Sequence, residues 1–148
     1  MIDSDSGSSA VASLEQVQAN AHPFCFACSG SNPMGLALRY TTAEDGSVSA
    51  TFLGHCALEG YPGVLHGGLV ATLLDGAMTN CLFARGIQAM TAELRVRYLA
   101  AIAVAETLTV RAWLEASHHG LLELRAEIQQ GGEVKARAHG KFIVPHAA

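Results

Sequence analysis

One apolar segment, residues 67 to 84, constrains the fold of this chain more than any other feature. Its apolar residues recur at i, i+1, i+4 and i+5, which is the spacing of an amphipathic helix. Arg85 and Gly86 follow, a cation in the last turn and then the residue favoured just beyond a helix. Such an apolar helix needs cover on most of its sides. The apolar face consists of Leu69, Val70, Leu73, Leu74, Ala77, Met78, Cys81 and Leu82.

Most of the remaining chain alternates between apolar and polar residues, which is typical of strands with one solvated face. Residues 36 to 42 and 47 to 53 predict a hairpin that turns at Asp45-Gly46. Four later segments predict a three- or four-strand antiparallel meander: 93–98, 106–116, 122–128 and 133–144. The expected fold class is therefore α+β, with an antiparallel β-sheet wrapped around one long central helix.

The length of 148 residues predicts a single domain. Residues 1 to 13 are small and polar and predict a disordered leader, and residues 14 to 21 predict a short helical turn. We therefore divide the chain into a flexible leader, 1–20, and one folded domain, 21–148.

Composition narrows the class of protein. Half of the residues are apolar and only 15% are charged, so we expect an apolar face to be covered in a homodimer or homotetramer. The net charge of −4 carries no cluster of Lys and Arg, which argues against nucleic-acid binding. No apolar run approaches the ~18 residues that span a bilayer, so we expect no membrane association. Four cysteines without a signal peptide predict reduced thiols and a cytoplasmic location.

Two of the cysteines, Cys25 and Cys28, form a C-x-x-C pair with His22 upstream and His55-Cys56 further along. These residues would suit a tetrahedral zinc site if their loops converged. A single C-x-x-C pair is weak evidence for a metal, and nothing around it predicts a redox motif. We therefore expect no metal and no cofactor, and leave the two cysteines open.

A carboxylate, Asp75, interrupts the apolar helix. A charge in such a place costs several kcal/mol unless it is solvated or hydrogen-bonded. Asp75 is therefore either a functional group or part of a solvated helix face with Thr72 and Thr79. At the helix start, Gly67 follows His66 and can present a free N–H to a closely approaching ligand.

Three segments together resemble the hotdog-fold acyl-CoA thioesterases of the phenylacetate-degradation type. They are "CFACSGSNPMGLALRY" at 25–40, "GYPGVLHGGLVATLLDGAM" at 60–78 and "AELRVRYLA" at 92–100. The resemblance covers about residues 22–145. It implies a curved sheet around the helix, pairing of two subunits edge to edge, and often a tetramer. It also implies an active site between subunits, with the glycine after the histidine on one chain and the helix carboxylate on the other.

The resemblance assigns roles that suit thioester hydrolysis. The Gly67 N–H, at a helix N-terminus, would stabilise the charge that develops on the carbonyl oxygen. Asp75, at the family spacing after His66, would attack the carbonyl or deprotonate a water. The Thr91 hydroxyl would bond the nucleophile or the water, unless it is an ordinary strand threonine. His66 would orient the loop or contact the thioester, unless it only holds the turn through the backbone.

The chain also departs from its relatives. Gly76 stands where many have an acid, and Gly60 where some have Asn or Gln. A water-positioning amide would then come from Asn80 or Gln88.

The expected substrate contacts of this site are Gly68, Asn80, Arg95 and Arg97. The two arginines would meet the phosphates of coenzyme A, unless they form a solvated strand face.

We therefore expect an acyl-CoA thioesterase that hydrolyses a small aryl- or medium-chain acyl-CoA. The alternative is a hotdog protein that binds an acyl thioester without turning it over. A hotdog dehydratase is disfavoured, because the short motif that pairs Asp with His is not found. The acyl group, the tetramer arrangement and the choice between nucleophile and base stay open.

Overall fold

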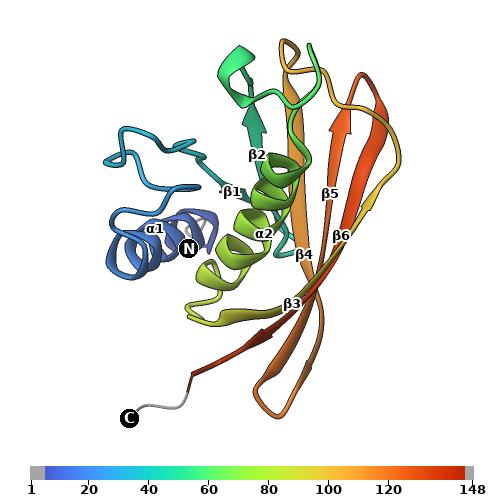
Figure 1. Cartoon of the computed structure of the whole chain (residues 1–148). Coiled ribbons are helices and arrows are strands. Elements are labelled where there is room, and N and C mark those ends of the chain that lie inside the picture. Colours follow the sequence, from blue (N-terminus) through green and yellow to red (C-terminus); the bar gives the residue numbers. More distant parts are fainter. Residues whose placement is uncertain (1–5, 146–148) are drawn as a thin grey trace.

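The computed structural model describes the backbone of residues 6–145 and the side chains of residues 14–145. A six-stranded antiparallel sheet curves around one long helix, α2, and a second helix, α1, packs on the side of α2 that faces away from the sheet (Figure 1). This is the predicted α+β hotdog arrangement. In chain order the elements are α1 (Ser6–Ala21), β1 (Thr41–Thr42), β2 (Val48–Phe52), the 3-10 turn η1 (Cys56–Leu58), α2 (Gly67–Phe83), β3 (Met90–Tyr98), β4 (Leu108–His118), β5 (Leu121–Gln130) and β6 (Glu133–Ile143).

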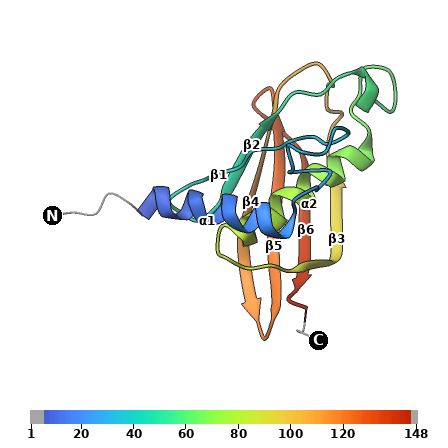
Figure 2. The same ribbon diagram turned by 90° about the vertical axis from the view of Figure 1, so that its left-hand side faces the viewer.

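The strands follow the order β1-β2-β4-β5-β6-β3, so β5 lies near the centre and β3 forms an edge (Figure 2). Their apolar residues alternate inward, as the period of two predicted: Val110 pairs with Ile128, and Leu124 with Gly140. All of these except Gly140 are completely buried hydrophobic side chains. The predicted meander of β4, β5 and β6 is confirmed, and β3 joins the sheet by pairing with β6.

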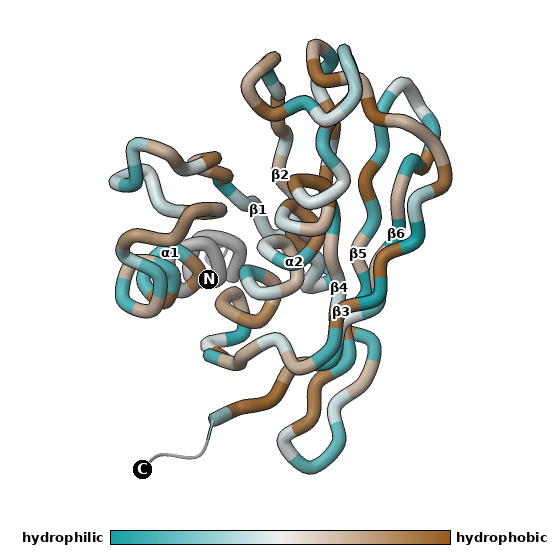
Figure 3. The backbone as a smooth tube through the Cα atoms, in the orientation of Figure 1, coloured by the Kyte–Doolittle hydropathy of each residue, from teal (hydrophilic) through white to brown (hydrophobic). Residues whose placement is uncertain are grey.

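The helix α2 supplies the centre of the core. Leu73, Leu74 and Met78 are completely buried against the sheet. Thr79 and Asn80, expected on the polar side, are 7% and 1% exposed. They are buried because α1 and the loop after it cover the side of α2 that the sheet leaves open. In Figure 3, hydrophilic residues gather at the turn between β4 and β5, away from α2.

The N-terminal region differs from the prediction. A helix, α1, begins at Ser6, where a disordered leader was expected to reach residue 13. Leu14 is 3% exposed, and Val17 packs against the same core. The spacing of three residues puts both on one helical face, and that face finds its partner on α2. Residues 1–5 of the expected leader lie outside the described residues.

The first predicted strand, residues 36 to 42, is much shorter than expected. Only Thr41–Thr42 pair with β2. The amides of Leu36 and Leu38 donate instead to the carbonyls of Phe26 and Ala27, at 2.8 and 3.0 Å. Apolar alternation alone did not reveal that a nearby loop would accept the backbone hydrogen bonds of this segment.

Among the described residues, no helix is long and apolar enough to cross a membrane.

Candidate functional site

The N-terminus of α2 exposes a backbone donor. His66 caps the helix, because its Nδ1 accepts a hydrogen bond from the Gly68 N–H at 2.9 Å. The ring therefore holds the turn through the backbone, which is one of the two roles considered for it. Nothing in the described part of the chain accepts the Gly67 N–H. A free N–H at this end of a helix is favourably placed to bind negative charge.

A cavity of about 710 Å³ opens beside this helix start and is lined mostly by apolar side chains of residues 60–70 and 98–102. Tyr98, at the end of β3, bounds it, and its hydroxyl donates to the Gly67 carbonyl at 2.7 Å. The sequence interpretation missed Tyr98, although it ends the alternating strand that carries Arg95 and Arg97. A Cβ added at Gly67 would meet the Tyr98 ring at 3.6 Å, which is ordinary contact.

Within the described part of the chain, the Asp75 carboxylate accepts one hydrogen bond. The Thr91 hydroxyl donates to Asp75 Oδ1 at 2.7 Å, a short bond of the kind formed with charged acceptors. The pairing of β3 with β6 shifts register between Thr91 and Glu93. Such bulges redirect a side chain, and this one lies where the Thr91 hydroxyl leaves the edge strand toward α2. Asp75 is half-buried and Thr91 exposed, so ligands can reach the pair.

The two ends of this candidate site are too far apart to act together within one chain. Eight residues of helix separate Gly67 from Asp75, a rise of about 12 Å. A single carbonyl group in hydrogen-bond contact with both would need them within a few ångströms. Both can contact one thioester only if they come from different chains.

The loop before β1 packs tightly against α2 directly after Asp75. A Cβ at Gly76 would lie 3.2 Å from the Tyr40 hydroxyl and 3.3 Å from the Ala27 Cβ. This close approach explains why the chain has no acid at position 76. The Tyr40 hydroxyl is buried without a hydrogen-bond partner among the described residues. Burial and the nearby thiols raise the pKa of Tyr40 well above its ordinary value, so the phenol stays protonated.

Two residues that were expected to contact the substrate form hydrogen bonds within the protein instead. Gly68 donates its amide to His66, as described above. Asn80 is 1% exposed, and its Nδ2 donates to the Gly76 carbonyl at 2.9 Å. The helix turns Asn80 toward the loop before β1, away from solvent, so its placement differs from the expected one. Gln88, the other amide considered, lies exposed after α2.

Arg95 and Arg97 lie on the sheet face opposite α2. They alternate along β3 with Leu94 and Val96, which pack toward the core. Arg95 forms an ion pair with Glu93 at 3.2 Å. Together with Arg125, Arg137 and His139, the two arginines line an open hollow of about 690 Å³. Within one chain, they are therefore separated from Gly67 and Asp75 by the sheet.

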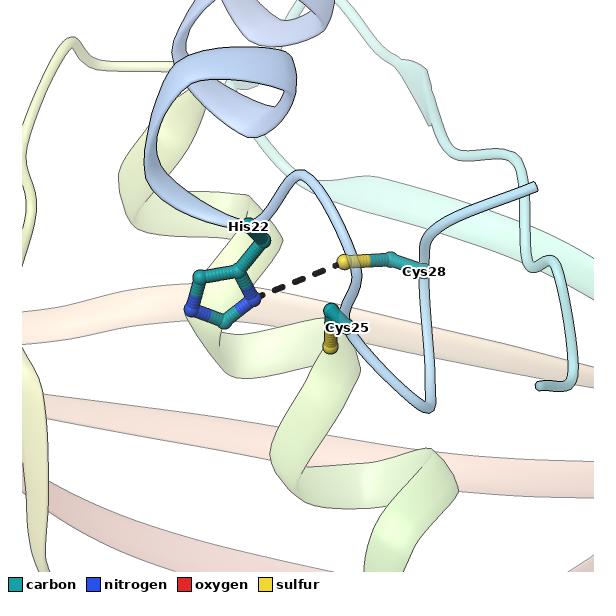
Figure 4. A group of neighbouring side chains, drawn as sticks. All are labelled: His22, Cys25 and Cys28. Carbon is teal, nitrogen blue, oxygen red and sulfur yellow. Dashed lines mark hydrogen bonds between the residues drawn. The ribbon is translucent and has the colours of Figure 1, made fainter. Parts of the chain in front are cut away.

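The loop after α1 brings together three groups with metal-binding chemistry. A ring nitrogen of His22 and the sulfurs of Cys25 and Cys28 all lie within 4.8 Å of one another (Figure 4). Burial lowers the pKa of His22, and the Asp75 carboxylate raises it by a smaller amount. Burial likewise raises the pKa of the Cys28 thiol, to about 11. The motif at His55-Cys56 does not join this group in the described chain.

The chain resembles known proteins over most of this architecture. A family model described as the thioesterase superfamily matches residues 62–136. Acyl-coenzyme A thioesterase THEM4 of Rattus norvegicus is 33% identical over 97 residues, which are 66% of this chain and 41% of that protein. The chain therefore spans less than half of the length of this relative.

Solved structures resemble it as well. A crystal structure of a thioesterase superfamily protein superposes with a TM-score of 0.74 at 28% identity, over 78% of this chain and 60% of that one. A phenylacetic acid degradation-related protein from Ralstonia eutropha has a TM-score of 0.67 at 24% identity, over 74% and 86% of the two chains. A hypothetical thioesterase with coenzyme A from Streptococcus pneumoniae has a TM-score of 0.68 at 21% identity, over 72% and 87%.

Proposed function

This chain belongs to the thioesterase superfamily, and on that premise we propose that it hydrolyses small aryl- or medium-chain acyl-CoA thioesters. The observation that carries the proposal is the hydrogen bond from Thr91 to Asp75, which holds in place the one charged side chain of helix α2. The sequence relatives that are named acyl-coenzyme A thioesterases support the substrate class.

The proposed reaction needs a base or nucleophile and a site for the oxyanion. Asp75 attacks the thioester carbonyl, or it deprotonates a water that does so. The carbonyl electrons move onto oxygen, where the Gly67 N–H stabilises them. When the carbonyl re-forms, the C–S bond breaks and coenzyme A leaves as a thiolate. If Asp75 is the nucleophile, water then hydrolyses the resulting anhydride to the free acid.

The proposal requires two subunits, since Gly67 and Asp75 of one chain lie too far apart. The strand β3 offers the means, because it is an edge strand with backbone groups free on one side. Pairing β3 with its copy about a twofold axis would bring Thr91 of one chain toward the α2 of the next. A C2 interface of this kind makes two equivalent sites.

The surroundings of Gly67 fit an acyl thioester. The apolar cavity of about 710 Å³ at the helix start can take the apolar part of the substrate. Coenzyme A is present in the Streptococcus pneumoniae structure of the same fold. We propose that Arg95 and Arg97 bind the phosphates of coenzyme A. Because both arginines lie on the outer face of the sheet, they would contact a coenzyme A molecule whose thioester is bound at the site of a neighbouring chain.

The decisive variant is Asp75→Asn, which keeps the shape of the side chain and removes its charge. We expect release of free thiol from phenylacetyl- and octanoyl-CoA to fall to background, while the circular dichroism spectrum still shows a folded chain. Wild-type turnover in Asp75→Asn would refute the assignment. Tight acyl-CoA binding by calorimetry in a wild-type chain with no turnover would favour the non-catalytic alternative.

The division of the site between chains has its own test. Gly67→Pro replaces the N–H by the proline ring at a helix position that tolerates proline, and His66 already has the ψ of 135° that a residue before proline prefers. Gly67→Pro and Asp75→Asn should each be inactive. After random subunit exchange, half of the dimers are mixed and each holds one intact site, so about a quarter of wild-type activity should return. A mixture that stays inactive despite exchange would contradict a shared site.

A further inference from the structure

We propose that His22, Cys25 and Cys28 form a binding site for a thiophilic divalent metal ion such as Zn²⁺. The three residues occupy one loop, with a spacing of three between successive members, and no role in thioester hydrolysis uses them. Their ligand atoms already lie within 4.8 Å of one another without any large loop movement. In Figure 4 the Cys28 thiol points at the His22 imidazole, and Cys25 lies beside them in the same loop.

The distances suit a tetrahedral ion. With Zn–S of about 2.3 Å and Zn–N of about 2.0–2.1 Å, a nitrogen and a sulfur ligand of one ion lie about 3.6 Å apart. The observed separation of His22 Nδ1 and Cys28 Sγ is 3.6 Å. The ligand set of one imidazole and two thiolates is among those that zinc favours, and soft sulfur disfavours Mg²⁺ and Ca²⁺.

The neighbouring groups are arranged as around a bound thiolate. The Ala27 N–H donates to Cys25 Sγ at 3.3 Å. The Gln18 side chain from α1 donates to Cys28 Sγ at 3.6 Å and to the carbonyls of Cys28 and His22, each at 3.1 Å. Donors of this kind orient the ligands of a metal and stabilise their negative charge.

The position of the ring is also fixed. His22 packs edge-on against Phe83 of α2, with ring centroids 5.0 Å apart. This contact directs Nδ1 toward Cys28, and the neutral ring would bind the metal through Nδ1 while Nε2 keeps its proton.

Three protein ligands leave one tetrahedral position for a water. The buried Tyr40 hydroxyl has no partner within the described chain and lies at the same contact between loop and helix, beside Ala27. On binding, the two thiols lose their protons to solvent and the ion gains two thiolate ligands, with no change in oxidation state. Because the loop packs on α2 at Gly76, a bound ion would fasten that loop next to Asp75.

The test uses the full chain, reduced and treated with a chelator, and titrated with Co²⁺ and then Zn²⁺. We expect one Co²⁺ per chain, with the thiolate charge-transfer band and intense visible bands of a tetrahedral site, and displacement of Co²⁺ by Zn²⁺. Cys25→Ser and His22→Gln should weaken binding at least tenfold, because each removes a ligand. Cys56→Ser is the matched control, since Cys56 is an exposed cysteine outside the group.

Three results would overturn the proposal. They are the absence of stoichiometric binding by the reduced wild-type chain, equal loss of binding in Cys56→Ser, and unchanged binding in Cys25→Ser. The same conclusion would follow if the reduced chain bound no Co²⁺ and the pair reacted only by forming a Cys25–Cys28 disulfide on oxidation, seen as a loss of two hydrogens in mass. Circular dichroism checks that each variant folds. Cys25 is only half-buried, so its replacement by Ser should disturb the fold little, and the test depends on this variant. Binding is the readout, so failure here leaves the thioesterase proposal untouched.

Discussion

The bond between Thr91 and Asp75 can be tested by removing only the hydroxyl. Thr91→Val preserves the shape and the β-branching that a strand favours. A hydrogen bond to a charged group contributes about 1.5–3 kcal/mol, and the exposure of Thr91 places this one at the lower end. If the bond positions Asp75 in the transition state, a loss of about 1.4 kcal/mol lowers kcat about tenfold. Free-thiol release under saturating acyl-CoA measures this directly.

Two further variants make that measurement specific. Thr91→Ser keeps the hydroxyl and should retain kcat within about threefold of wild type. Thr109→Val removes an exposed strand hydroxyl of β4 that takes no part in the site, and should leave kcat unchanged. The reasoning is refuted if Thr91→Val turns over substrate at the wild-type rate, or if Thr91→Ser loses as much activity as Thr91→Val.

The remaining predictions concern stability. Leu124→Ala in the completely buried centre of β5 should lower the free energy of unfolding by about 2–5 kcal/mol in urea, whereas Leu53→Ala at a 58% exposed position should change it by less than about 0.5 kcal/mol. The Ser47 hydroxyl and amide, and then Arg111, hold the pKa of the Asp45 carboxyl below its ordinary value. The ionised Asp45 carboxylate therefore contributes its full stabilisation above about pH 4, and this contribution is lost as pH falls through the lowered pKa. Asp45→Asn should flatten that part of the acid-unfolding curve. An acid-unfolding curve unchanged by Asp45→Asn would contradict this prediction.

The predicted elements that the structure confirms are those with a strong local period. The helix expected at 67–84 is observed at Gly67–Phe83, and the strands of the meander lie where the alternation placed them. The family match confirms the resemblance that the motifs around His66 and Asp75 had indicated. In each case the pattern reports which face of an element must be buried, and that requirement holds whatever the element packs against.

The errors arose where contact with another segment of the chain changed the outcome. Residues 36–38 alternate like a strand, but the loop at Phe26 and Ala27 takes their backbone hydrogen bonds. Asn80 was expected to contact the substrate, yet the loop before β1 buries it beside Cys28. A one-dimensional pattern holds no information about which segment will cover a polar face.

By itself, the sequence determined the helix, the alternating strands and the presence of one carboxylate on a largely apolar helix. Periodicity carries that information because burial is decided face by face along each element. The sequence left open whether Thr91 contacts Asp75 and whether His22 lies with the two cysteines, and the tertiary structure decided both. Those encounters depend on a bulge in β3 and on the packing of one loop against α2, and both are set by how separate elements fit together in space.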